Sequence, residues 1–564
     1  MDFKKEISKL LAEKVEGMDA EEILASIEIP PNKEMGDYSF PCFRLAKAMR
    51  KAPNMISQEI ADNIKSDLLK EVRNVGPYVN FFVNSEKINE FTLKEIFEKK
   101  DRYGSSDIGK GKNVLVEYSS TNIAKPFHIG HIRSTVIGDS IKKIFQFMGY
   151  NVTAINYLGD FGTQFGILLA AYKRWGDDDL LNSDPIRELL KLYVRFNDLK
   201  EEDESVMEEG REWFRKLESN DSEAVRIWTW FKEISLKEFN RVYDMLNIEF
   251  DSYDGEHFHS QFVGKLVEEL TDKKLLIESE DAMIIDLSDK DVAPAIILKR
   301  DGSSTYITRD IATAIYRKEK YDFDKNIYVV ATQQNLHFKQ LKYVLEKMGY
   351  EWFDDCEHVS FGMVSLADGT LATRKGKVVF LEDVLNQSVE KTKEIIEQRN
   401  PNLENKDSVA KQIGIGAVKF QELFNTRIKD YTFDWNQVLN FDGETGPYVQ
   451  YAYARANSIL NRLGIEISDD IDYSLLATDE EKDLVKSLYN VPSVIVSAME
   501  KLEPSIITRH VTEVAKYFNK FYNSVHIVNS EDDEKHARAL LVYATKVCIS
   551  NMLTLLGIET PEKM

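Results

Sequence analysis

The chain has 564 residues, of which 43% are hydrophobic and 30% are charged, a composition that favours three or four globular domains. It has no uncharged apolar run of about 18 residues, no secretory start, and three well-separated cysteines, which predicts a cytoplasmic protein without membrane spans, a disulfide framework or a cysteine zinc site. The net charge of −22 argues by itself against nucleic-acid binding, although a long chain can hold local basic patches.

The first part of the chain, up to about residue 100, predicts a compact α+β module. Amphipathic stretches indicate helices at residues 3–15 and near residues 43–50. A turn at Gly76 and Pro77 announces an aromatic strand that continues to residue 84.

A strand, a helix and a second strand are predicted over residues 113–118, 129–148 and 152–157. This order within about 45 residues is typical of a βαβ crossover, which requires a parallel sheet. A charged, helix-patterned insertion then interrupts the α/β pattern from about residue 170. Strand-like runs return at residues 282–285, 295–298 and 327–331, and from about residue 385 the pattern is almost entirely helical.

The loop after the first of these strands leads into the tetrapeptide His128-Ile129-Gly130-His131. In open α/β sheets, ligands lie beyond the carboxyl ends of the strands, where the N-terminus of a helix attracts anions. Gly130 leaves room for a flat ring, and the two imidazoles can donate to phosphate oxygens whose charge grows in a transition state. Four residues alone also occur by chance, but Asn122 and Lys125 just upstream favour a functional site.

Residues 117–135 resemble the signature of the arginyl-tRNA synthetases, a class I synthetase family. The resemblance implies that ATP binds over Gly130 and that His128 and His131 stabilise the α-phosphate while the carboxylate of L-arginine attacks it. The products would be arginyl-adenylate and pyrophosphate, and the arginyl group would then pass to the 3′ end of tRNA(Arg). Positioning and charge stabilisation account for most of such a reaction.

Two later segments, residues 302–312 and 331–338, resemble further blocks of the same family. A planar guanidinium is best bound by carboxylates, so Glu117 and Asp310 are the candidates for the side chain of the substrate. By motif position, the amino-acid end of the substrate would be bound by Ser120, Asn122, His128, Tyr306 and Gln334. His337 would lie near the nucleotide, with a merely packed histidine as the alternative.

The second class I signature, a lysine-rich loop, departs from the family pattern at residues 369–377. Thr370 and Thr373 replace its usual lysines. The resemblance implies that Lys125 substitutes for them, because a cation near the β- and γ-phosphates is what the reaction needs. Arg374 and Lys375 remain candidates for ATP binding, ATP is expected as its Mg²⁺ complex, and no zinc is expected.

Both ends of the chain resemble tRNA-binding parts of the family. Tyr448, Tyr451 and Arg455 recur at i, i+3 and i+7, which is one face of a helix and suits unstacked bases, although such a stripe is more often core. The final segment, ending in Met564, also resembles the end of the family near its anticodon site. In the N-terminal module, the candidates for RNA contact are Tyr78, Asn80 and Phe82, with strand core as the alternative for Phe82.

We therefore predict a Rossmann-like α/β catalytic domain of the class I synthetases over residues 101–385, with a helical insertion at about 170–290. An N-terminal α+β domain precedes it (1–100), and a connecting helical region (386–440) and an all-α anticodon-binding domain (441–564) follow it. The resemblance implies a monomer. The alternatives are a class I synthetase for another amino acid and a tRNA-binding paralogue without activity, although the latter should have lost His128, His131, Asn122 or Asp310.

Overall fold

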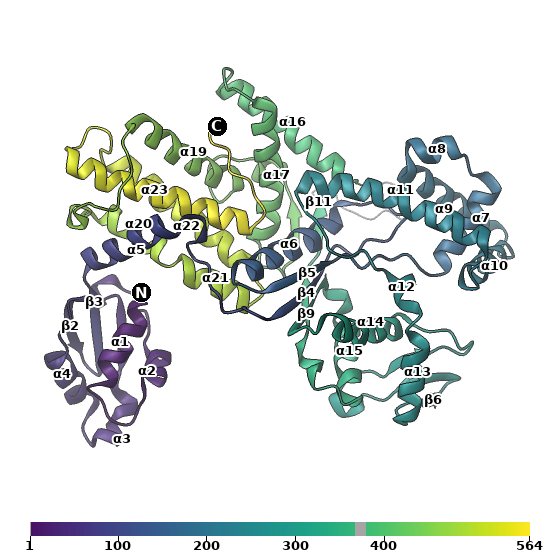
Figure 1. Ribbon diagram of the computed structural model, residues 1–564, viewed down its shortest axis with the longest axis horizontal. Helices are drawn as coiled ribbons and strands as arrows, with labels where there is room; N and C mark the ends of the chain where they lie inside the picture. The colour runs from purple at the N-terminus through teal and green to yellow at the C-terminus, as the bar shows by residue number, and fades with distance from the viewer. Residues whose placement is uncertain (1, 367–378) are drawn as a thin grey trace. The chain divides into compact units, whose positions relative to one another are not determined.

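The computed structural model describes residues 2–366 and 379–564 (Figure 1). The chain divides into two compact units. The first unit contains residues 1–103, 455–491 and 513–549. The second contains residues 104–454, 492–512 and 550–564, and it includes the loop and the helices that carry the predicted catalytic residues.

The N-terminal module of the first unit is a three-stranded antiparallel sheet with helices packed around it. The strands are β1 (Tyr38–Pro41), β2 (Leu69–Val75) and β3 (Tyr78–Val83), in the order β1-β3-β2. The helices are α1 (Phe3–Ala12), α2 (Ala20–Ser26), α3 (Ala46–Met49), α4 (Pro53–Asn63) and α5 (Ser85–Lys99). Asp19 and Glu22 form a capping box at the start of α2, which satisfies backbone N–H groups that the helix cannot pair itself.

The remainder of the first unit is helical. Its elements include α20 (Asp479–Tyr489) and parts of α19 (Gly446–Leu463), α22 (Ser505–Ser524) and α23 (Asp532–Leu555). The side-chain amide of Asn89 on α5 donates to the carbonyl oxygens of Tyr473 and Leu476 at 3.2 and 3.1 Å. These bonds tie α5 to the segment that leads into α20.

A parallel four-stranded sheet forms the centre of the second unit. The strand order is β10 (Cys356–Phe361), β9 (Lys325–Ala331), β4 (Asn113–Glu117) and β5 (Asn151–Ile155), and every pair is parallel. The crossover from β4 to β5 runs through α6 (Ile132–Phe147). The predicted βαβ unit and the predicted fold class are therefore confirmed.

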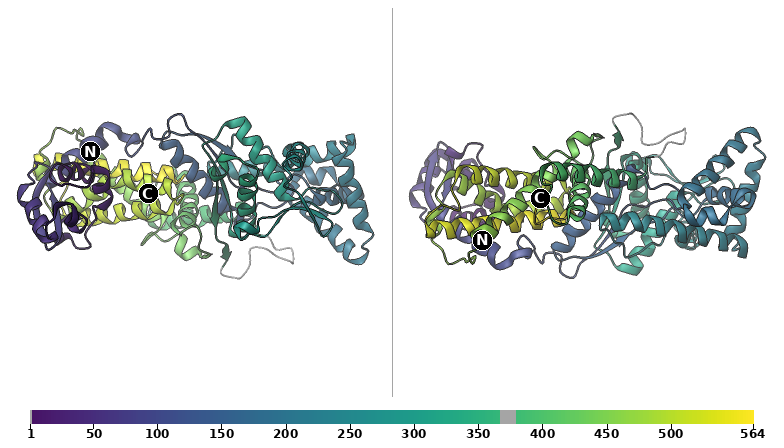
Figure 2. Two further views of the ribbon diagram at one scale, coloured as in Figure 1. Left: turned by 90° about the horizontal axis from the view of Figure 1, so that it is seen from below. Right: turned by 90° about the horizontal axis from the view of Figure 1, so that it is seen from above.

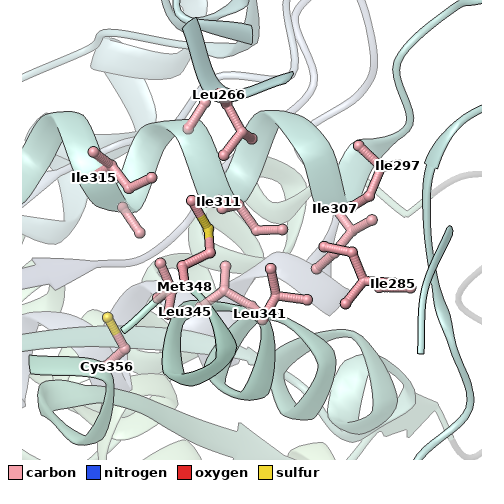
Figure 3. Packing of buried hydrophobic residues seen from close by; sticks show 14 of the residues in the cluster. Leu266, Ile285, Ile297, Ile307, Ile311, Ile315, Leu341, Leu345, Met348 and Cys356 are labelled. Carbon is pink, nitrogen blue, oxygen red and sulfur yellow. The ribbon is translucent and has the colours of Figure 1, made fainter. Parts of the chain in front are cut away.

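The hydrophobic core on one side of this sheet is built by α14 (Tyr306–Tyr321) and α15 (Asn335–Lys347) (Figure 3). Ile307, Ile311 and Ile315 of α14 recur at a spacing of four and meet Leu341 and Leu345 of α15. This packing fixes α14 against β9 and so sets the position of the polar residues that α14 also carries.

The insertion contains a helical bundle, drawn in blue in Figure 2, and a small separate sheet follows it in the chain. Its helices are α7 (Thr163–Trp175), α8 (Asp178–Ser183), α9 (Pro185–Glu202), α10 (Val206–Glu218), α11 (Ser222–Leu246), α12 (Glu256–Ser260) and α13 (Val263–Asp272). The strands β6 (Ile277–Ser279), β7 (Ala282–Ile285) and β8 (Ala295–Leu298) pair antiparallel. The runs predicted at 282–285 and 295–298 are thus strands, but they lie outside the parallel sheet.

The region from residue 379 onward is mainly helical, as predicted. It contains α16 (Leu381–Arg399), α17 (Lys406–Phe424), α18 (Trp435–Val438), α19, α20, α21 (Val491–Glu500), α22 and α23. One exception is β12 (Tyr431–Phe433), which pairs in parallel with β11 (Val364–Leu366). None of the helices in the described ranges has the length and apolar character that crossing a membrane requires.

The last residues of the second unit are fastened to two of its long helices. Ser140 on α6 donates from its hydroxyl to the carbonyl oxygen of Leu555 at 2.9 Å. The ammonium group of Lys419 on α17 is buried and donates to the carbonyl oxygens of Leu246 and Gly557. Residues 555–557 are therefore held by α6 and by α17 together.

Candidate active site

The loop that follows β4 has a strained backbone. Ser119, Ser120 and Ala124 have φ angles of 68°, 44° and 60°, a region that residues with a side chain rarely occupy. Such conformations persist only where the surroundings hold them, and they gather at functional sites. The N–H of Ser119 donates to Ser134 Oγ at 2.9 Å, and its hydroxyl accepts from Thr135 Oγ1 at 2.9 Å. The start of the loop is therefore fixed by α6.

Helix α11 of the insertion holds the same loop. The hydroxyl of Tyr243 lies 2.8 Å from the hydroxyl of Ser119, and Ser235 Oγ accepts from the N–H of Ala124 at 3.1 Å. The insertion is thus part of the scaffold of the site and not an appendage to it.

Asn122 lies against Gly159, which follows β5. The N–H of Gly159 donates to the carbonyl oxygen of Thr121 at 3.1 Å, and its own carbonyl oxygen accepts from the N–H of Ile123 at 3.2 Å. A Cβ at position 159 would lie 1.9 Å from Asn122 Oδ1. Only glycine therefore leaves the side chain of Asn122 in this position, where the carboxyl ends of β4 and β5 meet.

His128 and His131 form a stacked pair at the start of α6. Their ring centroids are 3.9 Å apart, with 29° between the planes. The Nδ1 atom of His128 accepts from the N–H of Gly130 at 3.1 Å, and that of His131 accepts from the N–H of His128 at 3.2 Å. Because Nδ1 is an acceptor in both rings, the neutral imidazoles carry their protons on Nε2, which is then a donor.

Burial keeps both imidazoles neutral. It lowers the pKa of His128 below 6.5 and that of His131 to about 3, an effect to which His128 adds. At neutral pH the rings therefore act as uncharged donors. Donors that are oriented in advance stabilise charge that develops on a phosphate in the transition state.

Gly130 is tightly enclosed by the neighbouring imidazole. A Cβ at this position would lie 2.9 Å from both Nδ1 and Cε1 of His128. The glycine is therefore required for the conformation of His128, in addition to any room that it leaves for a ligand.

Lys125 provides a cation three residues before His128. Burial lowers the pKa of Lys125 below 10.5 and is its only resolved cause, so no carboxylate of the described residues offsets it. An ammonium group in this setting, next to two imidazole donors, suits the negative charge of a polyphosphate.

The residues that follow the second signature return to the histidine turn. The N–H of Ile129 donates to the carbonyl oxygen of Val379 at 3.2 Å, and the N–H of Leu381 donates to the carbonyl oxygen of Phe127 at 2.9 Å. The candidates Arg374 and Lys375 lie in residues 367–378, outside the described ranges.

A buried charge network joins the start of α6 to the residues that precede that segment. Arg133 is fully buried, and its Nη1 donates to the carbonyl oxygens of Gly362 and Lys429 at 2.9 and 2.7 Å. Its Nε lies 3.6 Å from Glu422 Oε2, and the hydroxyl of Tyr431 donates to the same carboxylate. Helix α6 is therefore linked to α17, to β12 and to the entry of β11.

Asp310, in the second turn of α14, is bound to His337 at the start of α15. His337 Nε2 lies 2.6 Å from Asp310 Oδ2, and both side chains are half-buried. His337 therefore contacts the carboxylate that we predict to bind the guanidinium of the substrate. That His337 lies near the nucleotide stays a prediction.

Glu117, at the carboxyl end of β4, already faces an arginine of the chain. Arg317 Nη1 lies 2.7 Å from Glu117 Oε2, and both side chains are buried. Burial raises the pKa of Glu117, and Arg317 acts against that shift. The sequence analysis missed Arg317, although it lies seven residues after Asp310 and therefore on the same face of α14.

Tyr306 and Gln334 are both accessible. The side chain of Tyr306, at the start of α14, is 62% exposed, and the Arg309 guanidinium lies 4.7 Å from the centroid of its ring. Gln334 is exposed just before α15. A cleft of about 1210 Å³ opens beside Tyr306 and is lined on the insertion by residues such as Phe214 and Lys232.

The candidates for RNA contact on β3 differ in their exposure. Asn80 is 1% exposed and accepts from the hydroxyl of Ser39 at 2.6 Å, so its side chain belongs to the core and the prediction of a direct RNA contact is not supported. Tyr78 and Phe82 are half-buried, and the Arg73 guanidinium lies 4.7 Å from the ring centroid of Phe82.

The candidates on α19 keep partial exposure. Tyr448 is half-buried and Tyr451 is 40% exposed, both in the second unit. Arg455, in the first unit, is half-buried, donates to Asn519, and lies with its guanidinium 5.0 Å from the ring centroid of Tyr522. An arginine so engaged would need to leave these partners before it could contact RNA.

Met564 packs against buried side chains of the second unit. With Val389 and Phe441, it packs against a buried cluster that contains Ile396 and Ile413. Across residues 2–366 and 379–564, no group of three or more His, Cys, Asp and Glu side chains is arranged to hold a metal ion.

Three family models match successive parts of the chain. Residues 1–83 match the arginyl tRNA synthetase N terminal domain, residues 92–435 match the catalytic domain described as tRNA synthetases class I (R), and residues 449–564 match the DALR anticodon binding domain. The first and last matches coincide with the two regions in which the sequence predicts tRNA contacts.

Curated relatives and solved structures are similar over the full length. Arginine–tRNA ligases of Halothermothrix orenii and Clostridioides difficile are each 54% identical to the chain, with 100% of both chains covered. The arginyl-tRNA synthetase structure of Thermus thermophilus has a TM-score of 0.81 at 23% identity, with 100% of both chains covered. That of Plasmodium falciparum has a TM-score of 0.82 at 24% identity and covers 100% of this chain and 99% of its own.

Proposed function

Because the chain belongs to the arginyl-tRNA synthetases, the class I ligases that use ATP to join arginine to tRNA, we propose that the residues at the carboxyl ends of β4 and β9 carry out this reaction. The observation that carries the proposal is the stacked pair His128 and His131 beside Lys125. Two neutral donors and one cation are what the activation of a triphosphate requires.

In the first step, ATP enters as its Mg²⁺ complex and lies over Gly130. The Nε2–H groups of His128 and His131 donate to the α-phosphate as an arginine carboxylate oxygen attacks phosphorus. The bond to the β-phosphate breaks, and arginyl-adenylate and pyrophosphate form. Lys125 stabilises the departing pyrophosphate, in the role that the missing loop lysines have in other class I enzymes.

The substrate arginine lies between β4 and α14. Asp310 and Glu117 bind its guanidinium, because two carboxylates match the planar fork of donors. Ser120, Asn122, Tyr306 and Gln334 hold the amino-acid end, which directs the carboxylate toward the α-phosphate. His337 keeps Asp310 in place through the contact of 2.6 Å between Nε2 and Oδ2.

In the second step, the terminal ribose of tRNA(Arg) takes the arginyl group from the adenylate. Tyr78 and Phe82 on β3, and Tyr448, Tyr451 and Arg455 on α19, are the side chains that we propose for contacts with tRNA away from the catalytic site. The protein acts as a monomer in the cytoplasm, where its three cysteines remain reduced thiols. Sedimentation of the free protein at micromolar concentration tests the monomer.

Exchange of pyrophosphate into ATP tests the proposed function. The assay is run with each amino acid in turn, with and without tRNA. We expect exchange with arginine alone among the amino acids, and only when tRNA is present. If arginine supports no exchange under either condition, the proposal is wrong.

A further inference from the structure

Arg317 lies inside the pocket that we assign to the substrate, although its own side chain has the chemistry of the substrate. Its guanidinium is 1% exposed and forms the ion pair of 2.7 Å with Glu117. The rings of Tyr157 and Tyr328 lie with their centroids 5.5 and 5.6 Å from the guanidinium carbon. A guanidinium removed from water in this way needs a carboxylate partner to remain stable.

The charges of the chain at this position are not balanced. Glu117 and Asp310 are close enough that Asp310 contributes to the raised pKa of Glu117, yet Arg317 is the cation that pairs with Glu117 in the described residues. Asp310 has His337 as its partner, at 2.6 Å between Oδ2 and Nε2. Of these two carboxylates, the internal guanidinium pairs with Glu117 and not with Asp310.

The groups that surround the pair come from several elements. Five titratable side chains interact electrostatically with Glu117 or Arg317. They are Asp310 on α14, Tyr328 on β9, Tyr157 after β5, His259 on α12 and Cys356 on β10. Burial raises the pKa values of the two tyrosines and of Cys356 and lowers that of His259 to about 4, so these four groups are uncharged near neutral pH.

We propose that Arg317 is a positioning residue that sets the charge of the arginine pocket: it holds Glu117 in place as a carboxylate and leaves the site short of one positive charge, which the substrate guanidinium supplies. This inference rests on the proposed binding of that guanidinium by Glu117 and Asp310. It explains why a site for arginine contains a buried arginine of its own. The internal guanidinium neutralises the charge of one carboxylate. One cationic substrate molecule is then enough to neutralise the charge of the other.

The charge argument makes E117Q the most damaging of the substitutions at the pair. In E117Q the guanidinium of Arg317 stays buried and unpaired, and it repels the guanidinium of the substrate. Because like charges brought together in a buried site oppose binding strongly, we expect the KM for arginine to rise at least about 100-fold. In the double variant E117Q/R317M the repelling charge is also gone, and we expect the KM to recover by about 10-fold or more from that of E117Q.

The single variant R317M gives a second and independent readout. Without the cation, burial and Asp310 raise the pKa of Glu117 further than in the wild type, because the opposing effect of Arg317 is gone. The KM for arginine in R317M should therefore fall more steeply with rising pH than in the wild type, because the ionisation of Glu117 is shifted to higher pH. R317K keeps the charge and should restore the pH profile of the wild type, whereas E117Q/R317M should lack the steeper profile.

The measurement is arginine-dependent pyrophosphate exchange in the presence of tRNA, with the KM for arginine and for ATP and the kcat determined for each variant. We expect the KM for arginine to change and the KM for ATP to stay within about twofold, since the pair acts on one substrate. The matched control is E319Q/K265M, which removes an exposed pair that involves the same helix, with atoms 3.1 Å apart and side chains 59% and 69% exposed. It should behave as the wild type does.

Two results would overturn the role of Arg317. One is a double variant whose KM for arginine is no lower than that of E117Q. The other is an R317M enzyme whose KM has the same pH profile as the wild type. If instead the wild type shows no exchange with arginine, the proposed function itself fails. Thermal melting of each variant accompanies the kinetics, and if E117Q does not fold, the pH profiles of R317M, R317K and the double variant decide.

Discussion

At the scale of single residues, the candidate site depends on groups that are partly removed from water. His131 has a pKa of about 3 and Lys125 has a pKa below its usual value, in both cases because of burial. For a histidine with a lowered pKa, the unfolded chain binds a proton between about pH 6.5 and about pH 3 that the folded chain does not. The contribution of His131 to stability is therefore present above pH 6.5 and is lost as the pH falls below it.

Lys125 is the residue on which adenylate formation should depend most directly. K125A removes the cation that we propose for the pyrophosphate group, and the loss of such an electrostatic contact typically lowers kcat by about 100- to 1000-fold. We expect that loss in pyrophosphate exchange. The melting temperature should change little, because the side chain that is shortened is only half-buried. K125R, which keeps the charge, is the control, and near-normal exchange by K125A would contradict the assignment.

Gly130 tests the geometry of the histidine pair. In G130A the new Cβ would lie 2.9 Å from the imidazole of His128, so the ring must turn away from its hydrogen bond with the N–H at position 130. We expect kcat for exchange to fall by about 10-fold or more, since displacement of a catalytic group by about 1 Å has effects of that size. A matched change at an open glycine, G264A, has no atom within 4 Å of the new Cβ and should leave the rate unaltered.

At the scale of elements, α6 connects the histidine turn to the residues that enter β11. His131 immediately precedes its first turn, which carries Arg133, and Arg133 donates to the carbonyl oxygen of Gly362, which precedes β11. The partner of Arg133 in this network is Glu422, whose burial raises its pKa to about 7 although Arg133 acts against the shift. The folded chain thus holds a proton on Glu422 over a range of pH in which the unfolded chain has lost it.

Stability should accordingly fall as the pH rises through that range. A carboxyl with a raised pKa stabilises the folded state most below about pH 4.5, and this contribution is lost between about 4.5 and about 7, on the order of 3 kcal/mol for one buried group. E422Q lacks the titrating group, so its melting temperature should change less between about pH 5 and about pH 7. E394Q, at an exposed position on the neighbouring α16, should follow the wild type. Parallel curves for E422Q and the wild type would refute the argument.

The sequence predicts elements well where the pattern is local and apolar. The strands at 113–118, 152–157 and 327–331 and the helix between the first two are predicted, because each buried strand is an apolar run with a turn beside it. The strand β2 was not predicted, because apolar residues are interspersed with charged ones along Leu69–Val75 and none of its side chains is fully buried. β12 was missed because three residues carry no periodicity, and its partner β11 lies more than 60 residues away in the sequence.

The candidate site shows the same limit. The loop after β4 and the start of α14 are contiguous motifs, so their residues could be assigned by position. Arg317 lies further along α14, beyond the motif, and Glu422 and Tyr243 lie on α17 and α11, where no motif separates them from ordinary helix residues. The burial of Asn80 could not be predicted for a related reason: its partner Ser39 lies on another strand, about 40 residues away in the sequence.

At the scale of the whole molecule, the second unit is stabilised by hydrogen bonds that link α17 to the end of α11 and to the residues after α23. Lys419 is 2% exposed, and burial lowers its pKa to about 8 even though Asp139 acts in the opposite direction. Its ammonium group satisfies the carbonyl oxygen at the end of α11 and that of Gly557. The helix that holds the loop after β4 and the residues that follow α23 therefore share one donor.

Replacement of Lys419 should weaken the unit as a whole. In K419M two buried carbonyl oxygens lose their donor, at about 1–3 kcal/mol for each group. We expect the melting temperature to fall by several degrees in a thermal scan, and proteolysis near residue 555 to become faster. K411M, at an exposed position on the same helix, is the control and should be neutral. Equal melting of the two variants would show that the donor is dispensable.

The bond between Ser140 and Leu555 spans 415 positions in the sequence. Contacts of such long range form late, because the intervening chain must first be ordered. During synthesis, α6 leaves the ribosome long before residues 555–557 exist, so the nascent chain carries the histidine turn on a helix whose other half is still uncovered. A messenger truncated before codon 550 would therefore yield a chain with every catalytic motif but without the contacts that complete the helix beneath them. For an enzyme that supplies translation, we expect this arrangement to make activity depend on the presence of residues 555–557.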